Sequence, residues 1–342
     1  MITPPYNPNT NQIANGNFAA IDANFNDAKV ILLGGPWEGT ASYRTGTLDA
    51  PEKIIESSLQ IDVFDVTFPE INTAGKIYYD STYFNCIKDL AIETRQLYDD
   101  YINLQSTGVS EGVLDHIETI NENCEIMNDL IQAQADRALK LNKVVGLIGG
   151  DHSVSYGQIK AIGDHFENFS ILHIDAHHDL RIGFQGLQYS HAAVLANAIN
   201  DVSQIDQLTS IGIRDNCIEE FEFAAKHDKI STFYDEEISK QLLSGNSNWG
   251  EIVNQIIQTL SQNVYVTLDI DGLSIENTPF TGTPVPGGIS YHQVRYLLNQ
   301  LGKERKIIGF DVVESGSAQL DTIVSMRLVY KLCVASIASQ NN

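Results

Sequence analysis

The stretch HIDAHHDL, residues 173–180, places three imidazoles and two carboxylates within eight positions. In an extended chain alternate side chains point to the same face, so Asp175, His177 and Asp179 share one face while His178 points away. Carboxylates and imidazoles are common ligands of divalent metals in proteins. The stretch therefore indicates a metal-binding strand end.

Two further stretches carry matching groups. GGDHS contains His152, and DIDG contains Asp269 and Asp271, whose spacing of two again places both side chains on one face. With DAHHD they offer four carboxylates and two imidazoles, a set that suits two divalent cations about 3.5–4 Å apart. Four aspartates roughly balance two such ions, and oxygen-rich coordination with one imidazole per metal favours Mn²⁺, with Fe, Co and Ni as alternatives.

Several neighbouring polar residues have a simpler interpretation, because a single strand-end Asp usually caps a turn. His173 is expected to be a packed, hydrogen-bonded residue behind the ligands, and His178 a residue of the pocket wall. Asp151 is expected to order the GGDHS turn. Arg181 and Arg214 are expected to form salt bridges of the scaffold or contacts between subunits.

The polar clusters stand at the ends of apolar runs. Most of these runs are separated by helix-length amphipathic segments, a pattern typical of a parallel sheet covered on both faces. We therefore predict an α/β fold of three layers, α/β/α, with a parallel sheet of about eight strands. The runs are KVILLGG from Lys29, IDVFDV from Ile61, VVGLIGG from Val144, FSILHID from Phe169, LTSIGI near Ser210, KISTFY near Ile230, VYVTLDID from Val264 and KIIGFDVVE from Lys306.

One long helical stretch interrupts this alternation. It covers about 81–141 and is broken around STGVSEG, which predicts a helical hairpin or insertion beside the sheet; an oligomerisation arm is the alternative. No repeat or linker divides the chain, so residues 1–342 are interpreted as a single domain.

Composition limits the partners and the compartment. With 21 Lys and Arg against 44 Asp and Glu, the formal charge is -23. Nucleic acid and anionic membranes would repel such a protein, whereas a small cationic substrate would be attracted. The N-terminus lacks the pattern of a secretion signal. We expect no membrane-spanning helix, since no apolar stretch approaches the length of ~20 residues that spans a bilayer. Four scattered cysteines without a CxxC pair favour the cytoplasm.

Taken in order, GGDHS, DAHxD and DxD followed by TGTPVPGG resemble the ureohydrolase family of arginases and agmatinases. DAHHDLR with YSHAAVL, and GGPWEGTASYRTG near the N-terminus, are most similar to microbial agmatinases. The resemblance covers about residues 28–335 without the long helical stretch. It implies an arginase-like fold, two Mn²⁺ ions per subunit, and a homotrimer or homohexamer.

The resemblance also implies the reaction, which is hydrolysis of a guanidino compound to urea and an amine. Agmatine, which yields putrescine, is the first expectation; arginine, guanidinobutyrate, formiminoglutamate and guanidine are the alternatives. His191 matches the family's proton-shuttle histidine, and Glu314 matches the acidic residue that contacts the guanidinium. The implied metal ligands are His152 and Asp179 for one ion, His177 and Asp271 for the other, and Asp175 and Asp269 as bridges.

The physical demands of the reaction fit these roles. A guanidinium carbon is a poor electrophile, and metal ions can lower the pKa of water toward ~7 to make a nucleophile. Glu314 would orient and balance the guanidinium, and His191 would protonate the leaving amine.

Three departures from the family pattern fall beside these residues. Ser274 and Ile275 stand where relatives commonly have a proline-containing turn, SGSAQLD follows Glu314, and Ala192 replaces a glycine. The substrate is therefore less well defined than the mechanism. A two-metal phosphoesterase would need a GNH-type signature or a basic phosphate clamp, and the sequence has neither near the motifs. A non-catalytic relative would be expected to lose metal ligands, and none of the expected ligands is missing.

Overall fold

The computed structural model describes residues 9–10, 12–108 and 112–340. Within them, eight parallel strands form one sheet in the order β2-β1-β3-β8-β7-β4-β5-β6. The three-layer α/β/α prediction is confirmed. The strands are β1 (Val30–Gly35), β2 (Ile77–Asp80), β3 (Val144–Gly149), β4 (Phe169–Ile174), β5 (Ile205–Ile213), β6 (Ile230–Tyr234), β7 (Asn263–Asp269) and β8 (Lys306–Val313).

Seven of the eight apolar runs form strands, but the prediction for IDVFDV was wrong. This segment is a loop, in which Phe64 is 64% exposed while Asp65 is buried. The Asp65 carboxylate accepts hydrogen bonds from the backbone N–H groups of Thr67 and Phe68 and forms a buried ion pair with Lys331. The inward-facing polar group is thus satisfied by a turn and not by a strand. The edge strand β2 takes its place in the sheet.

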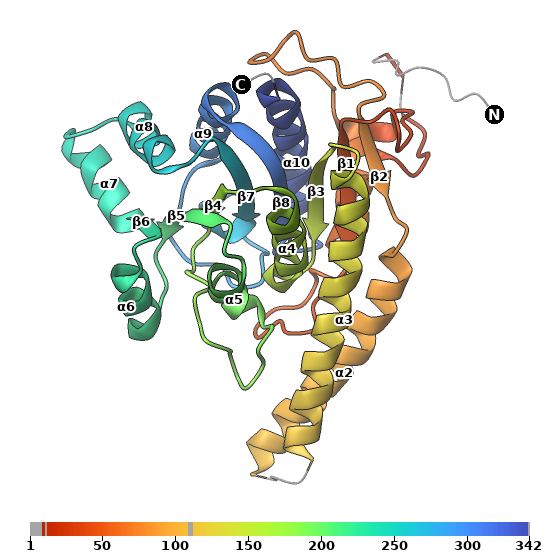
Figure 1. The fold of residues 1–342 in the computed structure, drawn as a ribbon, viewed down its shortest axis with the longest axis vertical. Coiled ribbons are helices and arrows are strands. Elements are labelled where there is room, and N and C mark those ends of the chain that lie inside the picture. The colour runs from red at the N-terminus through yellow and green to blue at the C-terminus, as the bar shows by residue number, and fades with distance from the viewer. Residues whose placement is uncertain (1–8, 11, 109–111, 341–342) are drawn as a thin grey trace.

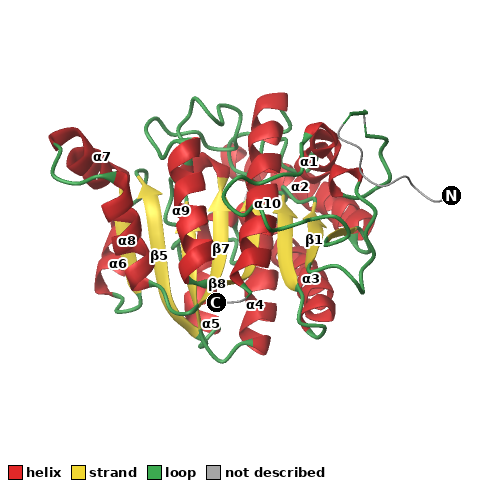
Figure 2. Cartoon of the chain, turned by 90° about the horizontal axis from the view of Figure 1, so that it is seen from above, coloured by secondary structure: helices red, strands yellow, loops and turns green. Residues whose placement is uncertain are grey.

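Ten helices cover the two faces of the sheet in the described part of the chain (Figures 1 and 2). One core cluster packs α1, α7, α8, α9 and α10 on one face, and a second packs α2 to α6 on the other. The helices are α1 (Ala50–Ser57), α2 (Phe84–Thr107), α3 (Val113–Leu139), α4 (Ser155–His165), α5 (Val194–Asp201), α6 (Ile218–Lys226), α7 (Asp235–Ser244), α8 (Trp249–Thr259), α9 (Tyr291–Glu304) and α10 (Gln319–Ser339).

The near-continuous apolar strands explain this layering. In β1, Val30 and Leu32 belong to the core cluster on one face, whereas Ile31 and Leu33 belong to the cluster on the other. All four are fully buried. Because alternate strand residues point to opposite faces, a strand covered on both sides must be apolar at every position.

The long helical stretch forms α2 and α3, which lie side by side and extend beyond the sheet (Figure 1). Helix α2 ends at Thr107, followed by Gly108 with a left-handed φ of 70°, a common helix terminator. The centre of the predicted break, residues 109–111, lies outside the described residues, as do residues 1–8 and 11 of the N-terminal segment for which no secretion signal is predicted. The assignment of one domain stays a prediction.

Helix α10 corrects the expectation about apolar length. It is the one helix among the described residues that is long and apolar enough to cross a membrane, and 78% of its most apolar window is buried inside the protein. Its apolar residues pack in the core with α9 and β8. The same composition therefore serves a core helix covered on nearly all sides.

The four central strands β3, β8, β7 and β4 are neighbours in the sheet and run in the same direction. Their carboxyl ends therefore meet at one edge, where ligands of open α/β sheets commonly bind. The predicted metal-binding motifs follow three of these strands, and Glu314 follows the fourth.

Candidate active site and metal centre

The turns after the strands aim the polar side chains at one another. Asp151 caps the short helical turn that begins at His152, because its Oδ1 accepts a hydrogen bond from the Ser153 N–H. At the end of β7, Asp269 accepts a hydrogen bond from the Asp271 N–H in the same way. The predicted role of Asp151 agrees with this geometry, and it also accepts hydrogen bonds from Thr40.

Three carboxylates converge on one buried imidazole nitrogen. His152 Nδ1 lies 2.8 Å from Asp179 Oδ2, 3.2 Å from Asp175 Oδ2 and 3.6 Å from Asp269 Oδ2. His152 is 1% exposed. This nitrogen faces three carboxylate oxygens, an arrangement that offers one imidazole and three oxygen donors to a cation.

A second imidazole stands on the other side of Asp175. His177 Nδ1 lies 3.0 Å from Asp271 Oδ2 and 3.5 Å from Asp175 Oδ1. The ligand atoms of these three residues all lie within 4.8 Å of one another. The two oxygens of Asp175 thus face two different imidazoles, which is the placement that a carboxylate bridging two cations requires.

The hydrogen bonds around His152 favour one tautomer of its ring. Its Nε2 lies 2.8 Å from the Thr267 hydroxyl, and that hydroxyl donates to Asp311 Oδ1 at 2.8 Å. Since the single hydroxyl hydrogen is used on Asp311, the hydroxyl accepts a hydrogen bond from Nε2–H. Nδ1 is then left without a proton in the neutral ring and is available as a metal ligand.

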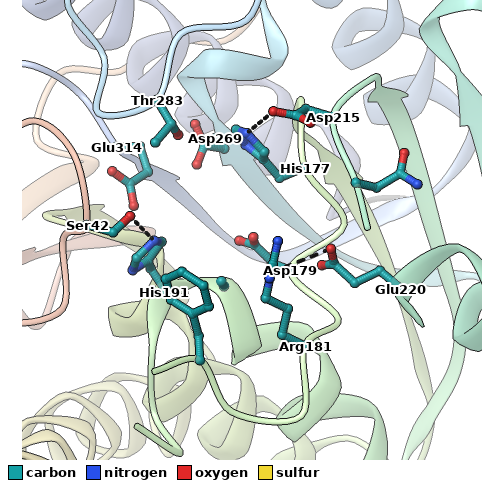
Figure 3. Close-up of a pocket in the computed structure, with 13 residues that line it drawn as sticks. Ser42, His177, Asp179, Arg181, His191, Asp215, Glu220, Asp269, Thr283 and Glu314 are labelled. Atoms are coloured by element: carbon teal, nitrogen blue, oxygen red, sulfur yellow. Dashed lines mark hydrogen bonds and ion pairs between the residues drawn. The ribbon is translucent and has the colours of Figure 1, made fainter. Parts of the chain in front are cut away.

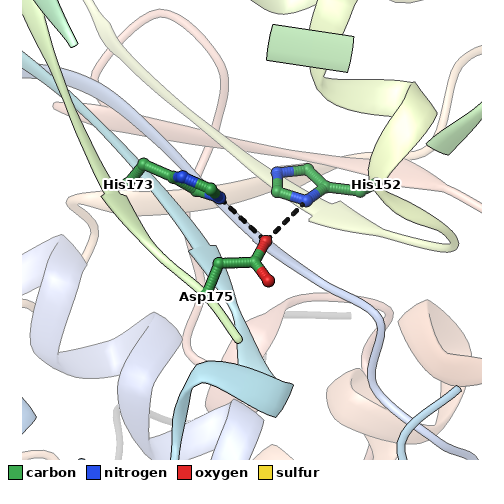
Figure 4. A group of neighbouring side chains, drawn as sticks. All are labelled: His152, His173 and Asp175. Atoms are coloured by element: carbon green, nitrogen blue, oxygen red, sulfur yellow. Dashed lines mark hydrogen bonds and ion pairs between the residues drawn. The ribbon is translucent and has the colours of Figure 1, made fainter. Parts of the chain in front are cut away.

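In Figure 4 the rings of His173 and His152 both point toward the carboxylate of Asp175. His173 Nδ1 lies 3.0 Å from the Ser210 hydroxyl, and its Nε2 lies 2.8 Å from Asp175 Oδ2. His173, His152 and Asp175 also have ligand atoms within 4.8 Å of one another. Both ring nitrogens of His173 thus have hydrogen-bond partners, which agrees with the predicted hydrogen-bonded role.

His178 is turned away from the cluster formed by His152, Asp175, His177, Asp179, Asp269 and Asp271, as strand alternation predicted. It is not among the residues that line the neighbouring cavity. It is fully buried, with Nε2 3.3 Å from the Tyr234 hydroxyl. Burial lowers the pKa of His178 to about 4. The pocket-wall interpretation was therefore wrong, because this ring packs between the strand ends and Tyr234.

The carboxylates of the cluster carry more negative charge than the protein alone balances. Burial, followed by repulsion from Asp271 and Asp175, raises the pKa of Asp269 well above its ordinary range. Burial and repulsion from Asp175 likewise raise the pKa of Asp271. Burial lowers the pKa of His177, but Asp271 and Asp175 overcome it and raise this pKa to about 12. The cluster therefore favours added positive charge, from protons or from cations.

The backbone is unusual where two of the predicted residues stand. Asp179 has a φ of 52° and Glu314 a φ of 58°, both in the left-handed region that few residues other than glycine adopt. At Gly272 a Cβ would lie 2.5 Å from the Asp175 backbone nitrogen, so only glycine lets the DIDG turn approach the DAHHD turn this closely. Such conformations cost free energy and are concentrated at functional sites.

The cluster forms the inner wall of a cavity of about 180 Å³ (Figure 3). Its walls come from the segments after β1, β4, β5, β7 and β8. The residues that line it are Ser42, His177, Asp179, Arg181, Phe184, His191, Ala192, Asp215, Asn216, Glu220, Asp269, Thr283 and Glu314.

His191 and Glu314 both face this cavity. Glu314 is 7% exposed and its Oε1 accepts a hydrogen bond from the His152 N–H at 2.8 Å. Burial, followed by repulsion from Asp151, raises the pKa of Glu314 well above its ordinary range. His191 Nε2 lies 3.4 Å from the Ser42 hydroxyl and Nδ1 lies 3.3 Å from the Thr40 hydroxyl.

The two arginines behave differently from each other. Arg181 lines the cavity and forms an ion pair with Glu220, at 3.6 Å, in agreement with the predicted salt bridge. Arg214 forms no carboxylate pair in the described residues, so a salt-bridge role for it was wrong. Its guanidinium instead donates to the carbonyl oxygens of Asp271, at 2.6 Å, and of Leu273, Val285 and Gly212. It ties together the loops that carry the cluster.

Sequence reasoning missed several groups of the site. Phe184 and Asp215 line the cavity from loops whose course no local pattern predicts, and Glu220 lines it from the first turn of α6. Thr283 lies within the TGTPVPGG motif, but its individual role was not predicted. Its hydroxyl donates a hydrogen bond to Asp271 Oδ2 at 3.2 Å. Asp311 could have been found from the sequence, because it is a carboxylate in the middle of a buried apolar strand. A buried carboxylate needs hydrogen-bond partners, which indicates a structural or functional role.

Comparisons with known proteins agree with this geometry. A sequence model of the arginase family matches residues 28–337. The chain is 27% identical over 297 residues to the N(1)-aminopropylagmatine ureohydrolase of Thermus thermophilus, covering 87% of this chain and 86% of that protein. It is 26% identical over 300 residues to the agmatinase of Pyrococcus horikoshii, with 88% of each chain covered.

The fold is similar to that of the agmatine ureohydrolase of Thermoplasma volcanium. The TM-score is 0.71 at 20% identity, with 96% of this chain and 97% of the other covered. The chain therefore belongs to the arginase family, as the order of its motifs predicted. It is a hydrolase of that family, and the matched range runs through the α2–α3 stretch that the motif resemblance left out.

Proposed function

We propose that this protein is a ureohydrolase that cleaves agmatine to putrescine and urea with two divalent cations, Mn²⁺ in the first instance. The observation that carries the proposal is the position of Asp175, whose two oxygens face two imidazole nitrogens, each surrounded by further carboxylates. The relatives named as agmatinases and aminopropylagmatine ureohydrolases support the choice of a guanidino substrate.

The donor set fits a pair of cations. His152 and Asp179 would hold one ion, His177 and Asp271 the other, and Asp175 and Asp269 would bridge. The raised pKa values of Asp269 and Asp271 reflect uncompensated negative charge that two divalent ions would neutralise. Bound there, the metals supply Lewis-acid charge and the activated water that attack on a guanidinium carbon requires.

Glu314 would bind and orient the guanidinium. Its carboxylate lies at the inner end of the cavity, where a planar guanidinium can donate to it in the charge-assisted manner of carboxylate pairs. A bound cation favours the ionised form of Glu314 and so opposes the effect of burial on its pKa.

His191 would protonate the leaving amine through Nε2. The Thr40 hydroxyl donates its hydrogen to Asp151 Oδ2, so toward the His191 ring it can only accept a hydrogen bond. The donor is Nδ1–H of His191, which lies 3.3 Å from the Thr40 oxygen. This leaves Nε2, beside Ser42 at the cavity, to exchange the proton. A positioned imidazole can act in this way as a general acid.

The outer part of the cavity supports a cationic tail. Among the cavity-lining residues, Arg181 is paired with Glu220. The Asp215 carboxylate lies 4.0 Å from His177 Nε2 and forms no ion pair with Arg181. An amine at the far end of agmatine suits this charge better than the carboxylate of arginine or guanidinobutyrate.

The deciding experiment is urea release by the protein loaded with Mn²⁺ and, separately, Ni²⁺. Agmatine, arginine, guanidinobutyrate, formiminoglutamate and guanidine form the panel, with formamide release as the readout for formiminoglutamate, because cleavage of the same C–N bond in that compound yields formamide and glutamate. We expect agmatine to have the highest kcat/KM. Metal-replete protein that cleaves none of these compounds would refute the ureohydrolase proposal and favour a non-catalytic role, and phosphatase activity would favour the two-metal phosphoesterase.

We further propose a cytoplasmic homotrimer or homohexamer that acts in polyamine biosynthesis. The four cysteines are free, which suits a reducing compartment. Mass measurement of the purified protein in solution tests the assembly, since a monomer would contradict it.

A further inference from the structure

We propose that Phe184 is a specificity residue that forms the apolar wall for the aliphatic tail of the substrate, and that the α2–α3 hairpin holds it in place. The substrate class is a guanidine with a linear alkyl chain of about four carbons. The inference rests on the proposed function for the identity of the substrate, but the anchoring by the hairpin can be tested without it.

Phe184 begins a tight turn between the DAHHD motif and His191. Phe184 and Leu187 exchange two backbone hydrogen bonds, of 3.0 and 2.9 Å. The residues between them, Gln185 and Gly186, have φ values of 54° and 77°. Positive φ at both central positions defines a type I′ turn, which suits glycine but not glutamine. Contacts from elsewhere must therefore stabilise Gln185 in this conformation.

Helix α2 provides two of these contacts. Tyr98 donates its hydroxyl hydrogen to Gln185 Oε1 at 2.6 Å, and Tyr101 donates to the Gln185 carbonyl oxygen at 2.7 Å. Both tyrosines are buried, at 3% and 1% exposure. The side chain and the backbone of the strained residue are thus each fixed by a phenol from the hairpin.

Helix α3 holds the other side of the turn. The Gln188 N–H donates to Asn121 Oδ1 at 2.8 Å. A Cβ at Gly186 would lie 3.0 Å from Ile117 Cδ1, so the turn backbone packs closely on this helix. Leu187 is 1% exposed and belongs to the core cluster of α2 and α3. Both helices of the hairpin therefore contact the turn and hold it.

The result is that the Phe184 ring stands at the cavity in a fixed position. Its centroid lies 6.1 Å from that of His191, with an angle of 79° between the rings. On the other side, the Arg181 guanidinium lies 4.9 Å from the ring centroid and is paired with Glu220. An alkyl chain attached to a guanidinium at Glu314 would pass His191 and meet this ring, the large apolar group among the cavity-lining residues.

The test uses full-length, metal-loaded protein and four variants. Tyr98→Phe with Tyr101→Phe removes both hydroxyls and keeps both rings. Phe184→Ala removes the wall, with Phe184→Leu as the conservative replacement. Thr119→Val removes a hydroxyl whose partner, the Asp115 carbonyl, lies within α3 itself, and serves as the matched control.

We expect the double tyrosine variant to raise the KM for agmatine and n-butylguanidine about fivefold with kcat nearly unchanged, as for the loss of a neutral hydrogen bond. Phe184→Ala should raise it about tenfold, and Phe184→Leu should restore most of the loss. Methylguanidine, which has no tail to contact the ring, should react with an unchanged kcat/KM. Bound metal should be unchanged throughout.

Amide hydrogen exchange of residues 182–190 tests the anchor independently of turnover. Exchange there should become faster in the double tyrosine variant and stay unchanged in Thr119→Val. Unchanged exchange, or a loss of kcat shared by all guanidines, overturns the inference. If the wild-type protein releases no urea at all, the proposed function fails, while the exchange result still judges the role of the hairpin.

Discussion

At the scale of single residues, the period-two alternation of a strand separates the proposed metal ligands from their neighbours in the sequence. Asp175 and His177 lie on the face of the cluster, and His178 packs on the opposite side against Tyr234. Neither hydropathy nor histidine content distinguishes these residues, but the direction of the side chain does.

Asp175→Ala is expected to remove the carboxylate that faces both imidazoles. Metal content should fall to background, and urea release should fall by at least about a hundredfold. His178→Ala is the control, and it should retain bound metal because its ring points away from the cluster. Metal analysis of the purified variants measures both, and equal loss of metal in the two would contradict the face assignment.

Asp321, at the start of α10, gives a prediction for stability. It is buried and accepts a hydrogen bond from the Phe280 N–H, and burial raises its pKa to about 6 from an ordinary value of 3.8. The folded state therefore keeps a proton that the unfolded state releases between about pH 4 and 6. Stability falls as the pH rises through this window and stays lower above it.

Asp321→Asn removes this titration and keeps an oxygen acceptor for Phe280. After allowance for solvent screening, we expect the variant to be more stable than wild type by about 1–2 kcal/mol at pH 8 and equal to it near pH 4. Urea unfolding at both pH values gives the two differences. A difference that does not change with pH would show that the carboxyl is ionised normally in the folded protein.

At the scale of elements, adjacent strands supply the proposed metal ligands and the groups that orient them. Thr267 in β7 links His152, which follows β3, to Asp311 in β8. These strands are neighbours in the sheet in the order β3-β8-β7. The register of a buried sheet thus determines which nitrogen of a histidine is free to bind metal.

Thr267→Val is expected to weaken metal binding about ten- to a hundredfold, because His152 loses the acceptor that fixes its tautomer. Thr267→Ser should bind nearly as well as wild type. Thr209→Val in β5 is a suitable control, since its hydroxyl contacts Thr259 and not the cluster. Competition with a chelator measures the affinities, and equal weakening by both valine variants would contradict the role of the hydroxyl.

Seven strands and the positions of the proposed metal-binding motifs follow from the sequence, because buried parallel strands are continuous apolar runs that end in polar clusters. Other features depend on distant contacts. Asp65 is buried in a loop because Lys331 reaches it from α10, and Arg214 binds carbonyls of loops that come together only after folding. The contacts that hold the Phe184 turn against α2 and α3 likewise could not be predicted, because no pattern in the sequence near the turn indicates them.

At the scale of the whole molecule, charge affects encounter with the substrate. The chain carries a formal charge of -23, and its cavity contains several carboxylates at the end of the sheet. Such a field attracts cations over distances comparable to the Debye length, which is ~10 Å at 0.1 M salt. The effect should scale with the charge of the ligand.

We therefore expect kcat/KM for agmatine, a dication, to fall about three- to tenfold between about 20 mM and 500 mM ionic strength. For n-butylguanidine, a monocation with the same chain length, the fall should be smaller, and for the net-neutral guanidinobutyrate it should be slight. Metal content, measured at each salt concentration, controls for loss of the cations. An equal fall for all three compounds would mean that salt acts on the protein and not on the attraction between its acidic surface and the substrate.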